Sequence, residues 1–358
     1  MTGHTRRPRY AGSNPRRFHE KYKELNPEQY PGDVEKVLAS GKTPAGTHRP
    51  IMVEEVLHCL RPSAGEIAVD CTLGGGGHAR AILERMQPGG RLIGLDVDPI
   101  ELPRTEERFR AAGIGPETFV ARHGNFAGLP QVLAGEGLST ADVILADLGV
   151  SSMQLDNPDR GFSHRGPGPL DMRMNPTRGE SASRLLVRLS EEELARLLTE
   201  NADEPHAQVI ARVLHRQPVD TTQALDRLVR AAITAACPNV AKPELKLSVR
   251  RTLQAIRIAV NDEFSALDWL LRTLPECLGA GGRVAVLTFH SGEDRRVKKA
   301  FQAGYRAGVY SSVADTVIRA SREETRANRR ASSAKLRWAV RAEMVDDSHE
   351  SRSLTHVR

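Results

Sequence analysis

The feature that most constrains the fold is a series of short apolar segments that alternate with helix-like segments from about residue 50 onward. The segments at 66–72, 91–98, 118–123 and 141–148 are predicted to be β-strands, and 283–289 is a fifth. Their side chains are almost continuously apolar, which is typical of strands buried on both faces of a parallel sheet. Alternation of such strands with helices predicts an α/β fold with helices on both faces of one sheet.

The fourth and fifth predicted strands are separated by about 130 residues, far more than a crossover helix needs. We therefore predict an inserted helical subdomain over 159–251, which begins with a loop rich in Pro and Gly. Its helices are expected at 190–199, 208–216 and 221–236. A long amphipathic helix at 252–278 then returns the chain to the sheet.

The two ends of the chain are more basic than its body, and the net charge is +6. Residues 1–50 hold ten Lys and Arg against five acidic residues, and 319–341 holds eight against two. Basic ends suit a polyanionic partner such as RNA, although a solvated tail that aids solubility explains the composition equally well. The predicted organisation is a disordered extension at 1–45, a sheet domain made of 46–158 and 252–343, and a disordered tail at 344–358.

Composition also excludes some classes of protein. No apolar run is long enough to span a membrane, and the basic N-terminus lacks the apolar core of a secretory signal, so we expect a cytoplasmic protein without membrane contact. The four cysteines are scattered without the spacing of metal ligands, which indicates reduced thiols and predicts no metal site.

A run of four glycines follows the first predicted strand, in "VDCTLGGGGHAR" (69–80), and a helix follows the run. Gly74, Gly76 and Ala79 fit the dinucleotide-binding fingerprint in its usual strand–helix context. Bare backbone is needed where a ligand must approach the first amides of the helix. About twenty residues later Asp96 ends the second strand, where a carboxylate can accept both hydroxyls of a ribose. Loop and acid together predict a cofactor that contains adenosine.

The glycines and Asp96 do not separate NAD from S-adenosyl-L-methionine. Asp70 and His78 make the site more polar than a pyrophosphate requires, whereas the zwitterionic methionine end of S-adenosylmethionine needs polar partners. The residues therefore favour S-adenosylmethionine modestly, and an NAD-dependent oxidoreductase stays an alternative.

Several longer blocks then occur in one order along the chain. They are "HRPIMVEEVL" (48–57), "DCTLGGGGHAR" (70–80), "GLDVDP" (94–99), "HGNF" (123–126), "DLGVSSMQLD" (147–156), "RGFS" (160–163), "GPLDMRMNPTRGESA" (168–182), "RRTLQAIRIAVNDEF" (250–264), "GGRVAVLTFHSGEDRRVK" (281–298) and "NRRASSAKLR" (328–337). This series resembles the ribosomal RNA small-subunit methyltransferase H family, formerly called MraW, over about residues 48–340. It departs from the family pattern at Gly292, where a large apolar residue is usual, at Asn175 and at Leu253.

The resemblance implies a Rossmann-like S-adenosylmethionine-dependent methyltransferase sheet with an inserted all-helical subdomain. It implies methylation of the exocyclic N4 of a decoding-centre cytidine in 16S rRNA, with the small ribosomal subunit as partner and a homodimer as a further expectation. Carried over by motif, the cofactor contacts are Gly76, Gly77, His78, Asp96, Phe126, Asp147 and Gln154. Three of them have ordinary alternatives: core filler for Phe126, helix cap for Asp147 and solvated loop residue for Gln154.

Methylation of a cytosine amine needs an acceptor for the amine hydrogens, because the nitrogen lone pair is delocalised into the ring. Positioning is expected to supply most of the remaining rate. Asp171 in "PLDMRM" and His290 in "TFHS" are the predicted catalytic residues, and Asp147 is a third candidate. A structural role for His290 explains the sequence equally well.

RNA recognition by this chain is expected to rely on arginine, because aromatic residues make up only 4% of it. The candidates flank the predicted site loops and begin the return helix: Arg160, Arg165, Arg173, Arg178, Arg250, Arg251 and Arg257. A DNA amino-methyltransferase is the nearer rival. Such enzymes carry an Asp/Asn/Ser-Pro-Pro-aromatic tetrapeptide where this chain has Asp147-Leu148-Gly149-Val150. A non-catalytic RNA-binding assembly factor would not need the glycine loop.

Overall fold

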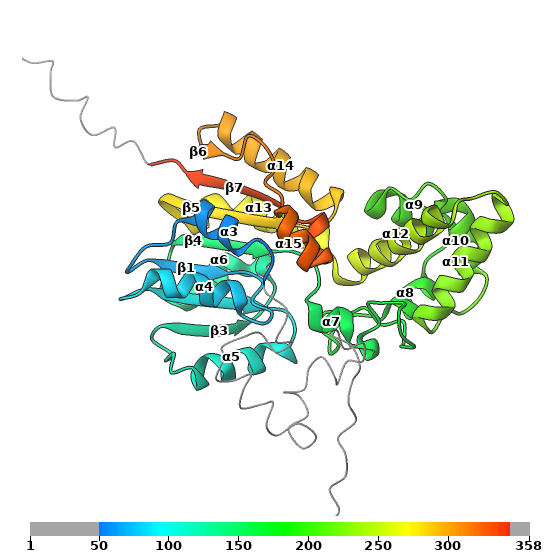
Figure 1. The fold of residues 1–358 in the computed structure, drawn as a ribbon, viewed down its shortest axis with the longest axis horizontal. Coiled ribbons are helices and arrows are strands. Elements are labelled where there is room, and N and C mark those ends of the chain that lie inside the picture. The colour runs from blue at the N-terminus through cyan, green and yellow to red at the C-terminus, as the bar shows by residue number, and fades with distance from the viewer. Residues whose placement is uncertain (1–49, 344–358) are drawn as a thin grey trace, which may run out of the picture. The chain divides into compact units, whose positions relative to one another are not determined.

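The computed structural model describes residues 50–343, so the extension predicted at 1–45 and the tail predicted at 344–358 lie outside the described residues. Contacts divide the described chain into a sheet unit (50–106, 114–149 and 262–343) and a helical unit (107–113 and 150–261). The sheet unit holds seven strands (Figure 1). They are β1 (Ile67–Asp70), β2 (Arg91–Asp96), β3 (Phe119–His123), β4 (Ala141–Asp147), β5 (Leu278–Thr288), β6 (Tyr310–Val313) and β7 (Lys335–Arg341).

The strands are ordered β3-β2-β1-β4-β5-β7-β6 in one sheet. Neighbours from β3 to β5 run parallel, and β7 lies antiparallel to both β5 and β6. The order reverses between β1 and β4, which is the point of a Rossmann-like sheet where a ligand-binding crevice opens at the carboxyl ends of the strands. The predicted α/β, Rossmann-like fold is confirmed.

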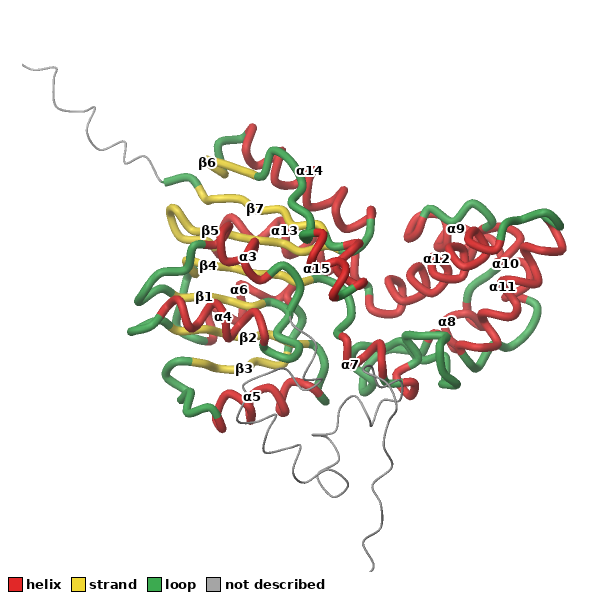
Figure 2. The backbone as a smooth tube through the Cα atoms, viewed as in Figure 1, coloured by secondary structure: helices red, strands yellow, loops and turns green. Residues whose placement is uncertain are grey.

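Helices cover both faces of this sheet, as continuous apolar strands require. The helical elements of the sheet unit, with α5 shared between the units, are α3 (Val53–Leu60), α4 (Gly77–Met86), α5 (Glu101–Ala111), η2 (Phe126–Gly128), α6 (Leu129–Gly135), α13 (Glu263–Cys277), α14 (Ser291–Arg306), α15 (Arg322–Ala327) and η4 (Arg329–Ser333). Apolar residues of α6, α13 and α14 share one core with β1, β2, β4 and β5. On the opposite face α3 packs against β5 and β7, and α4 against β1 and β2 (Figure 2).

The helical unit has its own apolar core, formed mainly by α8 to α12. Its elements are α7 (Ser152–Asp156), η3 (Pro158–Arg160), α8 (Ala182–Arg188), α9 (Glu191–Ala202), α10 (Ala207–His215), α11 (Thr222–Ala236) and α12 (Lys242–Asn261). The three helices predicted from hydrophobic spacing appear as α9, α10 and α11. At the start of α9, Ser190 and Glu193 form a reciprocal capping box, with Ser190 Oγ accepting from Glu193 N at 3.2 Å.

Two predictions were wrong at the level of elements. The single helix predicted at 252–278 is two helices, because Asp262 between α12 and α13 has a φ of 50° and interrupts the right-handed helix. The strands β6 and β7 were not predicted: β7 lies within the stretch 319–341, which was predicted only to be basic, and β6 has only four residues, two of them serine. Part of that charge is used inside the fold: Arg337, 7% exposed, lies with Nε 2.7 Å from Asp294 Oδ1.

Within the described residues, no helix is both long and apolar enough to cross a membrane. Three of the four cysteines are buried and Cys237 is exposed, and none of the four is in a disulfide.

Candidate functional site

The glycine loop joins the end of β1 to the start of α4 at the switch point of the sheet. Gly74 and Gly76 have φ values of 47° and 76°, and Gly76 is the N-cap of α4. These left-handed conformations explain two of the four glycines. The other two differ: a Cβ on Gly77 would overlap the ring of Pro50, whereas a Cβ on Gly75 would meet open space. Gly77 is therefore required by packing, whereas no described atom fills the space beside Gly75 where a side chain would begin.

Asp96, at the end of β2, holds the glycine loop in place. Its Oδ2 accepts from Gly74 N at 2.7 Å, and its Oδ1 accepts from Asp98 N at 2.8 Å. The other side of the same peptide is held by Thr105 of α5, whose hydroxyl donates to Gly74 O at 2.5 Å. Sequence reasoning did not find Thr105, which lies 31 residues from Gly74. Burial raises the pKa of Asp96 to about 6, although its backbone hydrogen bonds act in the opposite direction.

Asp147, at the end of β4, lies beside the same loop. Its backbone N donates to Thr72 Oγ1 at 2.6 Å, and its Oδ2 is 3.5 Å from His78 Nδ1. Its Oδ1 is buried and has no hydrogen-bond partner among the described residues. Burial, and secondarily the charge of Glu293, raise the pKa of Asp147 to about 7. The carboxyl group of Asp147 can therefore hold a proton near neutral pH. Its Oδ1 can also accept a hydrogen bond from a ligand.

His78, in the first turn of α4, is buried and shared between two partners. Its Nε2 lies 3.0 Å from Ile51 O, so Nε2 carries a proton and Nδ1 faces Asp147. Burial lowers the pKa of His78, so the ring is mostly neutral at pH 7. The fold thus brings Asp147 and His78 together. The raised pKa of Asp147 and the lowered pKa of His78 both favour the neutral forms of the two side chains.

A third carboxyl group completes the polar rim of the crevice. Asp70, at the end of β1, is 1% exposed and accepts from Thr72 N at 3.0 Å. Burial raises its pKa to about 6. The carboxyl ends of β1, β2 and β4 thus each carry a desolvated aspartate around one glycine loop. A cationic ligand would favour their charged forms, whereas an anionic one would be repelled.

Phe126 begins η2, directly after β3. It is partly buried and packs against the apolar core of the sheet unit. The structure therefore gives this ring a packing role, and its contact with adenine stays a prediction.

Two predicted site residues, Gln154 and Asp171, belong to the helical unit. Gln154 is 6% exposed and completes a capping box in α7, where its Oε1 accepts from Ser151 N at 2.9 Å. Asp171 accepts two hydrogen bonds from Arg173, at 2.8 Å from Nε and 2.7 Å from Nη2. Burial acts to raise the pKa of Asp171, but the hydrogen bonds and charge of Arg173 outweigh it and the pKa is lowered.

His290 is the N-cap of α14, at the end of β5. Its Nδ1 accepts from Glu293 N at 3.4 Å, and its Nε2 lies 3.1 Å from Glu293 Oε1. Glu293, 2% exposed, also accepts from Phe289 N at 2.8 Å. Sequence reasoning missed Glu293, although the spacing of an N-cap residue and a Glu three positions later was a usable signal.

The predicted RNA-binding arginines are not equivalent. Arg160 is 8% exposed and donates to the carbonyl of Met174 at 2.8 Å, so it acts within the fold. Arg173 is paired with Asp171. Arg165, Arg178 and Arg250 are exposed.

Comparison with known proteins adds to this geometry. The model of the MraW methylase family matches residues 45–342. Ribosomal RNA small subunit methyltransferase H 2 of Alkaliphilus metalliredigens is 48% identical over 342 residues, which cover 94% of this chain and 97% of that protein. Ribosomal RNA small subunit methyltransferase H 1 of Lachnoclostridium phytofermentans is 47% identical over 344 residues, which cover 95% and 93%.

Proposed function

The chain belongs to the MraW methylase family, and from this premise we propose that it methylates the exocyclic N4 of a decoding-centre cytidine in 16S rRNA. S-adenosylmethionine is the methyl donor of these methylases. The names of the relatives support ribosomal RNA of the small subunit as the substrate. The choice of cytosine N4 rests on the family resemblance of the sequence.

One observation carries the assignment of the cofactor: the three aspartates with raised pKa values around the glycine loop. When bound, S-adenosylmethionine supplies a methyl group on a cationic sulfonium and carries an ammonium group as well. Asp70, Asp96 and Asp147 offer negative charge to such a ligand. The pyrophosphate of NAD would place two further anions against them, which disfavours the oxidoreductase alternative.

Within this proposal Asp96 accepts the ribose hydroxyls while it holds Gly74. The bare backbone at Gly75 and Gly76 admits the methionine end of the ligand to the first amides of α4. His78 lies beside Asp147, with its Nδ1 3.5 Å from Asp147 Oδ2. These residues bind and orient, and no acid is needed for a neutral thioether to leave.

We assign the acceptor of the amine hydrogens to Asp147. Its Oδ1 is buried and unpartnered within the described chain, and a raised pKa makes the carboxylate a better base. Asp171 and His290 stay predictions for this role. The partners of Asp171 weaken it as a base, because Arg173 stabilises the carboxylate.

The test is methyl transfer from labelled S-adenosylmethionine to 16S rRNA, offered free and within assembled small subunits, followed by mass spectrometry of the nucleosides. N4-methylcytidine at one position is the expected product, and Asp147→Asn should lower turnover at least tenfold at saturating S-adenosylmethionine, beyond any loss of cofactor affinity that follows from removing its charge. A methylated base other than cytosine, or transfer to DNA instead, would overturn the proposal. Light scattering of the purified protein checks the predicted homodimer.

A further inference from the structure

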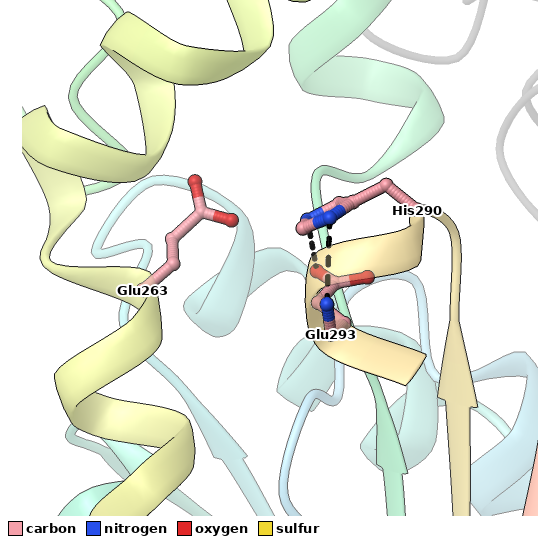
Figure 3. A group of neighbouring side chains, drawn as sticks. All are labelled: Glu263, His290 and Glu293. Atoms are coloured by element: carbon pink, nitrogen blue, oxygen red, sulfur yellow. Dashed lines mark hydrogen bonds and ion pairs between the residues drawn. The ribbon is translucent and has the colours of Figure 1, made fainter. Parts of the chain in front are cut away.

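Three side chains of the sheet unit converge outside the glycine loop. They are Glu263 at the start of α13, His290 at the N-cap of α14 and Glu293 in the first turn of α14. Each offers one ligand atom, and these atoms all lie within 4.8 Å of one another. Figure 3 shows the Glu263 carboxylate directed across the gap toward the imidazole of His290, with Glu293 beside the ring.

The imidazole of His290 is the unusual member of this cluster. Its side chain is 8% exposed, and Nε2 is buried. Although Nε2 lies 3.1 Å from Glu293 Oε1, it makes no hydrogen bond with any described residue. A buried polar atom without a partner is costly, so this atom points to a ligand of another kind.

We propose that Glu263, His290 and Glu293 bind one divalent transition-metal cation of the class of Mn²⁺ or Zn²⁺. A cation can be bound by the two carboxylates and the imidazole at the same time, whereas one hydrogen bond joins only two atoms. One nitrogen and two carboxylate ligands suit Mn²⁺ or Zn²⁺, whereas Mg²⁺ and Ca²⁺ prefer oxygen alone. Three protein ligands leave further coordination positions for water.

The surroundings hold these ligands in place. The ring of Phe264 lies 5.7 Å from that of His290, centroid to centroid, and supports the imidazole. The guanidinium of Arg296 stacks over the same phenyl ring at 3.7 Å, and its Nε lies 3.3 Å from Asp268 Oδ1. Arg296 of α14 is thus engaged with Phe264 and Asp268 of α13.

The competing explanation is that His290 and Glu293 only cap α14. In the capped form Nδ1 accepts from Glu293 N, and the ring proton lies on Nε2. Coordination through Nε2 moves that proton to Nδ1 and gives up this hydrogen bond. At 3.4 Å the bond is long, so its loss is small beside three metal–ligand bonds. A cap involves only His290 and Glu293, whereas the carboxylate of Glu263 also lies within 4.8 Å of the other two ligand atoms.

The test uses the full chain without an affinity tag, stripped with a chelator and titrated with MnCl₂ while electron paramagnetic resonance reports free Mn²⁺. We expect one Mn²⁺ per chain, displaced by Zn²⁺ but not by equimolar Mg²⁺. Glu263→Gln should weaken binding at least about tenfold. Glu276→Gln is the matched control, because Glu276 is an exposed glutamate on the same helix and should bind as the wild type does.

A second variant separates metal binding from capping. His290→Asn keeps a good N-cap acceptor and removes the imidazole, so it should retain the thermal midpoint of the metal-free protein while losing Mn²⁺ affinity. The proposal is overturned if the wild type binds no stoichiometric Mn²⁺, or if Glu263→Gln and His290→Asn bind as tightly as it does. None of these readouts depends on methyl transfer, so the proposed function stands or falls separately.

Discussion

At the scale of single residues, Asp96 links the cofactor crevice to the backbone that forms it. Asp96→Asn places an amide against one of the two backbone N–H donors and removes the charge. Because hydrogen bonds to a charged group contribute about 1.5–3 kcal/mol each, we expect affinity for S-adenosylmethionine to fall roughly 10- to 100-fold, measured by calorimetry. Asp142→Asn is the matched control, since Asp142 also accepts a backbone N–H, from Ile67 at 2.8 Å, but at the start of β4. Equal losses in both variants would refute a specific role for Asp96.

The raised pKa of Asp147 lets us predict how the free energy of unfolding depends on pH. Its pKa rises on folding from 3.8 to about 7, so between these values the folded protein binds more protons than the unfolded chain does. The free energy of unfolding must therefore decrease as the pH rises from about 4 to about 7. Asp147→Asn removes the contribution of Asp147 to this dependence, and without cofactor the variant should be more stable than the wild type at pH 8 by about 1–2 kcal/mol.

Urea unfolding at pH 5 and pH 8 measures this difference, with Asp142→Asn, at the other end of β4, as the control variant. The advantage of Asp147→Asn should be larger at pH 8 than at pH 5. Asp70 and Asp96, whose pKa values are also raised, add to the same trend in the wild type and stay in the variant. An advantage that is equal at both pH values would contradict the assigned burial of Asp147.

Residues of the site were predictable from the sequence where a residue type suited to the chemistry occurs at a recognisable spacing from a strand or helix. The glycine loop and Asp96 carry such a local signal, and the structure joins them through the bond between Gly74 and Asp96. Thr105 carries none of it, because its partner Gly74 lies 31 residues away and is set by how α5 packs against the sheet. Sequence alone could name a polar residue on that helix but not the atom that it would contact.

At the scale of elements, the predictable strands are those with apolar residues on both faces. β1, β2 and β4 satisfy that condition, whereas β7, at 335–341, includes three basic residues. Asp294 of α14 pairs with two of these residues, Lys335 and Arg337, and the third, Arg341, donates to the carbonyls of Pro275 and Val309. That pairing depends on the final fold, and the missed strand follows from it.

The break between the helices α12 and α13 gives a testable prediction at the scale of secondary-structure elements. Asp262 adopts a left-handed conformation that aspartate and asparagine tolerate but β-branched residues do not. Asp262→Val should lower the free energy of unfolding by about 1–2 kcal/mol, whereas Asp262→Asn should change it by less than about 0.5 kcal/mol. Denaturant titration of the two variants provides the comparison, and equal stabilities would mean that the helix runs through this position.

The contact between α13 and α14 gives a second testable prediction at the scale of elements. A Cβ on Gly292 would lie 2.6 Å from Phe264 Cζ, so the phenyl ring fills the space that a large residue at 292 would occupy. Gly292→Leu alone should cost about 1–3 kcal/mol through overpacking. Adding Phe264→Leu should recover part of that loss, and a double-mutant cycle measures the coupling. Additive effects would show that the two positions do not share this volume.

At the scale of the whole molecule, the proposed RNA substrate predicts a steep salt dependence. Each phosphate contact in a single strand contributes about −0.7 to the slope of log affinity against log salt. Neutralising the exposed Arg165, Arg178 and Arg250 to Gln should therefore flatten the slope, measured by filter binding of 16S rRNA fragments. Arg212→Gln is the control, because Arg212 is exposed but paired with Glu191 at 3.2 Å. If the triple substitution leaves the slope unchanged, these three arginines do not contact the phosphates of the RNA.

The main segment of the helical unit begins after β4 and ends just before α13. The strands on either side of this insertion, β4 and β5, are neighbours in the sheet. Since α13 alone is long enough to carry the chain from one parallel strand to the next, the excursion is a detour that the sheet does not need for its connectivity. Lineages could lengthen, shorten or exchange that detour to meet new substrates while the machinery that handles the methyl donor is inherited unaltered.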